Sequence, residues 1–150
     1  MQTFKRQLHA HCLTLLTRRI AAIDTIMAEC QAAANSESKT TAGDKHETGR
    51  AVAQLDRENH AVQRVAALKS LERLRAIDLG QHYDEAETGA LIETDKGYVF
   101  LAISAGKVDL NGKLCRLVSI ESPFGQAFLG AEEGDQIHFR GQDYEVLAVS

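Results

Sequence analysis

The feature that most constrains the fold is a helical repeat of apolar residues in the first part of the chain. Between about residues 4 and 34 these residues recur every three or four positions. The repeat runs through Leu13, Leu16, Ile20, Ile23, Met27 and Cys30. Alternating steps of three and four are typical of a coiled-coil seam. Because the only proline is Pro123, no proline interrupts a long helix before that point.

A second seam follows a polar break in the sequence. It consists of apolar residues with one asparagine among them: Val52, Leu55, Asn59, Val62, Val65, Leu68, Leu71, Leu74 and Ile77. A buried asparagine on such a seam can fix the register of two helices. Two helical segments of similar length, joined by a short polar connection, are expected to fold back on each other. We therefore predict an antiparallel coiled-coil hairpin over residues 1–77, with its tip near residues 36–49.

The second half of the chain has the apolar spacing of strands. We interpret the acidic segment 78–90 as a linker. Residues 91–150 alternate apolar and polar positions, with turn signals at 94–97, at Asn111-Gly112 and at 140–143. A short helix is expected with Pro123 in its first turn and Gly130 as its stop. The sequence thus predicts an α+β protein whose C-terminal domain, residues 91–150, is a small antiparallel β-sheet with one short helix.

Charge is distributed unevenly between the two halves. Residues 1–77 contain 12 Lys or Arg and 8 Asp or Glu, and residues 78–150 contain 5 and 13. The net charge of −4 therefore divides into +4 and −8. This division favours two surfaces with different partners, although helices whose exposed faces are simply rich in arginine would give the same numbers.

The composition also argues against several classes of protein. No apolar run approaches the roughly 20 residues that span a bilayer, and the first residues lack a signal-peptide cleavage site. Aromatic residues make up only 5% of the chain and Trp is absent, which argues against a base-stacking platform. The three cysteines, Cys12, Cys30 and Cys115, form no Cys-x-x-Cys pair. We expect reduced thiols in a cytoplasmic protein.

The polar break between the two seams contains the first candidate site. The sequence Gly-Asp-Lys-His-Glu at 43–47 places Asp44 and Glu47 three residues apart. One interpretation is a helix cap, in which Asp44 accepts hydrogen bonds from backbone N–H groups. The other is functional, because carboxylates at this spacing share one helix face and supply part of the oxygen shell that Mg²⁺ prefers. Gly49 lowers the helix propensity of this first turn, which a purely structural cap does not explain.

Two patches of the sequence resemble the Gre family of bacterial transcript cleavage factors. Residues 43–47 are similar to the family's Gly-Asp-x-Ser-Glu, and "SPFGQAFLGAEEGD" at 122–135 is similar to its Ser-Pro-x-Gly-x-Ala-x-x-Gly-x-x-x-Gly-Asp pattern. The second patch is the more specific, because many positions match at fixed spacing. The sequence departs from the family at His46, where the family has Ser, and at Gly49 and Arg50, where it has small and acidic residues.

The resemblance implies a fold and a mechanism. Gre proteins join an N-terminal antiparallel coiled coil to a C-terminal sheet domain related to FKBP-type prolyl isomerases. They dock on RNA polymerase and pass the coiled-coil tip down its secondary channel. There an acidic pair helps to hold a second Mg²⁺, and the polymerase hydrolyses the 3′ end of backtracked RNA. Such a protein is an accessory factor and not itself an enzyme. We also expect a monomer with no membrane association, and nucleic acid, DNA included, close to its surface.

Residue by residue, the resemblance assigns two roles in this chain. Asp44 and Glu47 are the expected catalytic pair and hold Mg²⁺ together with the polymerase. Glu121, Ser122 and Pro123 are the expected partner-binding residues. The net positive charge of residues 1–77 suits a position near RNA, and Arg50 is the candidate nucleic-acid contact closest to the acidic pair. Two rival hypotheses remain. One is a regulator that binds the secondary channel without stimulating cleavage, and the other is a coiled-coil adaptor, unrelated to transcription, in which the acidic pair is only a cap.

Overall fold

The structure is a computed structural model that describes residues 2–37 and 43–150, apart from the side chains of residues 34, 36, 37, 43–48 and 50. The chain divides into two compact units. The helical unit is Leu16–Leu71, and the sheet unit combines Met1–Leu15 with Glu72–Ser150. Two long helices, α1 (Gln2–Glu37) and α2 (Gly43–Arg75), each contribute residues to both units.

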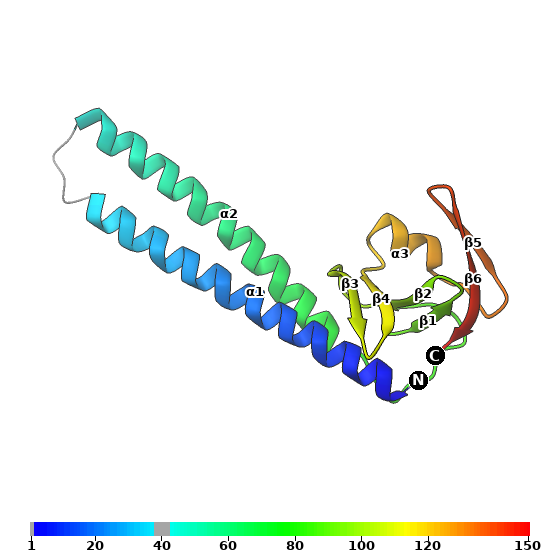
Figure 1. Ribbon diagram of the computed structural model, residues 1–150. Helices are drawn as coiled ribbons and strands as arrows, with labels where there is room; N and C mark the ends of the chain where they lie inside the picture. Colours follow the sequence, from blue (N-terminus) through cyan, green and yellow to red (C-terminus); the bar gives the residue numbers. More distant parts are fainter. Residues whose placement is uncertain (1, 38–42) are drawn as a thin grey trace. The chain divides into compact units, whose positions relative to one another are not determined.

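In the helical unit α1 and α2 lie side by side and antiparallel (Figure 1). Arg64 Nε donates to Asp24 Oδ1 at 2.6 Å, and Arg57 Nη1 donates to Gln31 Oε1 at 2.6 Å. Seven residues forward along α1, from Asp24 to Gln31, thus correspond to seven residues backward along α2. Leu16 and Ile23 of α1 are buried, as the predicted seam requires.

The seam predicted for α2 is wrong over most of the helical unit. Four of its apolar members are more than half exposed: Val52, Leu55, Val62 and Val65. The more enclosed positions include Ala53, Arg57, His60, Arg64 and Ala67, together with Leu71, which the predicted seam also contained. Polar residues of α2 bond to α1 on the enclosed side. The pairs Arg64–Asp24 and Arg57–Gln31 place this side of α2 next to α1, and the valine side faces solvent.

The sheet unit contains six strands and one short helix. In chain order they are β1 (Leu91–Thr94), β2 (Gly97–Leu101), β3 (Gly106–Leu110), β4 (Lys113–Val118), α3 (Pro123–Phe128), β5 (Gln136–Phe139) and β6 (Gln142–Val149). The spatial order is β3-β4-β2-β1-β6-β5.

These elements confirm the predicted α+β class, the hairpin at Asn111-Gly112 and the helix that starts at Pro123. The sheet is mixed, however, and not purely antiparallel, because β2 pairs with β4 in parallel. The tight hairpin brings β4 back against β2 and leaves β3 at the sheet edge.

The core of the sheet unit lies between the sheet, α3 and the segment that precedes β1. Phe124 and Phe128 of α3 pack against Tyr144, with ring centroids 5.6 and 5.5 Å from its ring. Residues 78–90 do more than link elements, because Tyr83 and Ala86 belong to this core. Ala86 N–H donates to the carbonyl of Ala131 at 2.8 Å, and Gly130 N–H donates to the carbonyl of Ala86 at 2.7 Å.

Candidate functional site

The expected metal-holding residues begin the second long helix. Residues 44 and 47 lie in the first turns of α2, which starts at Gly43, so the backbone places them three positions apart on one helix. The side chains of Asp44, Glu47 and Arg50 lie outside the described residues. Among the side chains that the structure does describe, no cluster of three or more His, Cys, Asp or Glu could hold a metal ion. Metal binding at Asp44 and Glu47 therefore stays a prediction.

The expected partner-binding residues lie in the loop between β4 and α3, and Ser122 organises this loop. Ser122 is the N-cap of α3, and its Oγ accepts from Gly125 N–H at 3.1 Å. The same hydroxyl donates to the carbonyl of Ser119 at 2.7 Å, and Ser122 N–H donates to that carbonyl at 3.1 Å. One side chain therefore satisfies a free N–H of the helix start and also closes the turn before it.

Glu121 stands at the exposed edge of the same turn. Its N–H donates to Ser119 Oγ at 3.1 Å, while Oε1 lies 2.6 Å from Nη1 of Arg73. Both side chains are more than half exposed, so the ion pair itself adds little to stability. It does hold the carboxylate in one place at the surface. Sequence reasoning missed Arg73, because nothing local in the sequence connects the end of α2 with residue 121.

Pro123 and Gly125 complete the loop by shape. Pro123 is the first residue of α3, where its fixed φ suits a helix start and its missing N–H leaves no donor unsatisfied. A Cβ on Gly125 would lie 2.0 Å from the carbonyl oxygen of Ser119, closer than any real contact. The glycine is thus required for α3 to approach the turn.

Surface hollows flank the loop within the sheet unit. One of about 460 Å³ is lined by Arg73, Glu121 and the residues that follow α2. Another of about 380 Å³ is lined by Ser122, Pro123 and Phe124. The three expected partner-binding residues therefore lie on a hydrogen-bonded turn that borders two surface hollows.

Cys12 and Cys115 do not supply a nucleophile to any of these sites at neutral pH. All three are free thiols, and Cys12 and Cys115 are completely buried in the sheet unit. Burial raises the pKa of Cys12 to about 12. Burial and the neighbouring Cys12 raise the pKa of Cys115 to about 12 as well. Both thiols stay protonated near pH 7, and a protonated thiol is a poor nucleophile.

Comparison with known proteins gives a distant result. No protein-family model and no curated protein matches the sequence. Among solved structures, the chain is similar to one described as the structure of the transcription factor Gfh1. The identity is 16%, the match covers 91% of this chain and 92% of the other, and the TM-score is 0.34. Within residues 2–37 and 43–150, neither long helix has the apolar stretch that a membrane span needs.

Proposed function

We propose that this protein is a Gre-like regulator of bacterial RNA polymerase that places the start of α2 in the secondary channel and stimulates cleavage of backtracked RNA. The observation that carries the proposal is the antiparallel pairing of α1 and α2 through Asp24–Arg64 and Gln31–Arg57. Because of this pairing, the start of α2, with the sequence Gly-Asp-Lys-His-Glu, is at one end of a two-helix pair. An end of two helices is narrow enough to enter a channel.

The chemistry assigned to that end needs two carboxylates that act with ligands from a partner. Asp44 and Glu47, at i and i+3 of a helix, would share one face. Two carboxylates provide only part of the near-octahedral oxygen shell of Mg²⁺, so the polymerase must supply the rest. The ion would stabilise the attacking and leaving oxygens during RNA hydrolysis. Arg50, close behind on the helix, would contact the RNA phosphates near the 3′ end.

Docking is assigned to the turn at Glu121, Ser122 and Pro123. Its support is the rigidity of the turn, in which Ser122 Oγ bonds both to Gly125 and to Ser119. A preformed turn loses little conformational entropy on binding, so contacts made by its exposed residues are not offset by ordering.

The test is RNA shortening in purified, backtracked polymerase complexes with Mg²⁺ present. We expect the wild-type protein to shorten the RNA and the Asp44→Ala/Glu47→Ala variant to lose this activity while it still binds polymerase. A matched control is Asp56→Ala/Glu58→Ala, which removes two exposed carboxylates further along α2 and should leave shortening unchanged. Equal activity of both double variants would exclude the metal-holding role of the pair.

A second candidate function is favoured by one departure of the sequence. His46 replaces the serine of the family motif between the two carboxylates. A larger, titratable side chain at this position favours a factor that binds in the channel without stimulating cleavage. In this case wild type competes for the channel, yet the RNA keeps its length. An adaptor unrelated to transcription would not co-elute with polymerase in the same experiment.

A further inference from the structure

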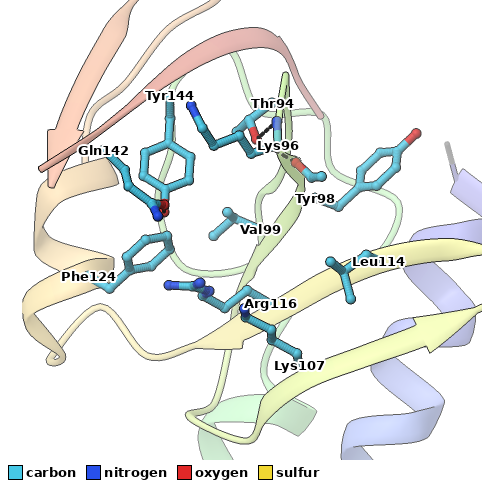
Figure 2. Close-up of a pocket in the computed structure, with 11 residues that line it drawn as sticks. Thr94, Lys96, Tyr98, Val99, Lys107, Leu114, Arg116, Phe124, Gln142 and Tyr144 are labelled. Atoms are coloured by element: carbon cyan, nitrogen blue, oxygen red, sulfur yellow. Dashed lines mark hydrogen bonds between the residues drawn. The ribbon is translucent and has the colours of Figure 1, made fainter. Parts of the chain in front are cut away.

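A small cavity on the sheet unit collects positive charge. It has a volume of about 120 Å³, and its walls include Lys96, Lys107 and Arg116 together with Phe124 and Tyr144. Figure 2 shows Lys107 and Arg116 extending alongside each other, with the Arg116 guanidinium reaching toward Phe124. The guanidinium carbon lies 4.3 Å from the centre of the Phe124 ring. The ring face thus fixes the arginine without neutralising it.

The two central cations face each other across a strand pair. Lys107 of β3 and Arg116 of β4 are directly opposite in the antiparallel register. Like charges at such positions destabilise a sheet. In the part of the chain that the structure describes, no carboxylate lies within ion-pair distance of either residue. The free protein therefore retains a repulsion that a bound anion would relieve.

This positive charge lies in a part of the chain that is otherwise negatively charged. Residues 78–150 contain only five Lys or Arg against 13 Asp or Glu. Four of these five line this cavity or the hollow of about 380 Å³ that adjoins it: Lys96, Lys107, Arg116 and Arg140. Lys96 also lies 3.7 Å from the carboxylate of Asp95, so the groove's charge rests mainly on the other three. Neither space has an Asp or Glu among its described lining residues. An acidic unit with a lysine- and arginine-lined groove is complementary to a short anionic group and repels an extended polyanion.

The adjoining hollow has a different character. It shares Lys107, Arg116 and Phe124 with the small cavity, and its further walls include Pro123 and Phe139. Its size and apolar wall suit a large apolar side chain, whereas the small cavity suits a single carboxylate. Arg140, beside Phe139, holds φ at +50°. This left-handed conformation is uncommon for a long side chain.

We propose that these two adjoining spaces bind an acidic segment of a partner protein, with a carboxylate between Lys107 and Arg116 and a neighbouring apolar side chain against Phe124 and Phe139. A bound peptide with one or two acidic residues can place all of its negative charge inside the positively charged groove. A nucleic acid carries a phosphate at every residue and would extend over the acidic remainder of the unit, whose net charge opposes it. The larger space borders Ser122 and Pro123, to which docking on polymerase is assigned above. Peptide binding is measured without polymerase, so failure of the one proposal is distinguishable from failure of the other.

The experiment selects random peptides displayed on phage against immobilised protein. We expect wild type to enrich peptides in which Asp or Glu stands close to a large apolar residue. The Lys107→Gln/Arg116→Gln variant should lose this enrichment. The matched control Lys113→Gln/Lys69→Gln, which removes two positive charges that line neither space, should keep it. For a selected peptide, fluorescence anisotropy should show binding weakened about tenfold or more by the double variant, and weakened further by salt.

Several results would overturn the proposal: peptides without acidic enrichment, unchanged binding by the Lys107→Gln/Arg116→Gln variant, or a thymidine oligonucleotide that binds wild type more tightly than the selected peptide does. Inorganic phosphate is a further competitor, and displacement of the peptide by phosphate at lower concentration than by free peptide would also count against a protein partner. Thermal unfolding of Lys107→Gln separates binding from folding. Loss of the cross-strand repulsion should leave its melting temperature unchanged or raised, whereas a purely structural lysine would lower it.

Discussion

At the scale of the residue, Gly125 decides whether the candidate partner-binding turn can form. The turn and α3 meet where a Cβ would be 2.0 Å from the Ser119 carbonyl oxygen and 2.8 Å from its carbon. Both atoms belong to the backbone, so no side chain can rotate away to make room. Gly125→Ala must therefore displace either α3 or the residues 119–122 that carry Glu121 and Ser122.

We expect Gly125→Ala to lower the free energy of unfolding by about 1–3 kcal/mol, the usual cost of overpacking. Gly80→Ala is the matched control, because its added Cβ would meet only the carboxylate of Asp78, at 3.3 Å on a flexible side chain. Urea unfolding followed by tyrosine fluorescence measures both. Equal stability of the two variants would show that the turn yields without cost.

At the scale of the element, the periodicity of the sequence predicts that α2 is a helix but not which of its faces packs against α1. The sequence pattern places Leu55 and Leu71 on one seam, yet Leu55 is 57% exposed and Leu71 is 8% exposed. Periodicity identifies the helix but ranks faces only by apolar content. On the observed face Arg57 and Arg64 donate hydrogen bonds to α1, and the sequence does not show which polar residues will meet.

The two leucines provide a direct test of this arrangement. We expect Leu71→Ala to cost about 2–5 kcal/mol in unfolding free energy, because it leaves a cavity in packed surroundings. Leu55→Ala should cost less than about 0.5 kcal/mol, because the side chain is mostly in water. Both changes are identical in chemistry and lie on one helix, and far-UV circular dichroism follows their unfolding. Losses of about 2–5 kcal/mol for both variants would mean that Leu55 is buried, as the predicted seam requires.

The strands show the same division between local and long-range information. The Asn111-Gly112 turn was predictable and sets the hairpin register, so the facing pair Lys107 and Arg116 could have been found by counting back from the turn. The parallel pairing of β2 with β4 could not, because a strand pattern does not name its partner. For the candidate site, Pro123 at the helix start followed from local rules, whereas Ser122 was assigned only through the resemblance. The Arg73–Glu121 pair depends on tertiary contact.

At the scale of the whole molecule, one buried lysine joins segments from both ends of the sequence within the sheet unit. Lys5, in the first turns of α1, is 1% exposed, and its Nζ donates to the carbonyl of Ser150 at 3.0 Å. The same ammonium lies 4.5 Å from the centre of the Tyr83 ring. Burial lowers the pKa of Lys5 from 10.5 to about 8, and the charge of Asp78 offsets part of this effect.

This lowered pKa should make stability depend on pH in a definite direction. Between about pH 8 and pH 10.5 the unfolded chain keeps a proton on Lys5 that the folded chain has released, so the free energy of unfolding should rise with pH, by up to about 1.4 kcal/mol per pH unit. Cys12 and Cys115 act in the opposite direction, because their raised pKa values lower stability above about pH 9. The variant Lys5→Met keeps both cysteines but lacks the lysine. The difference in unfolding free energy between wild type and this variant therefore isolates the contribution of Lys5. All three tyrosines lie in the sheet unit, so urea unfolding followed by their fluorescence from about pH 7 to pH 9 reports on this unit. Parallel curves for the two proteins would show that the folded protein keeps the proton on Lys5 and that burial does not lower its pKa.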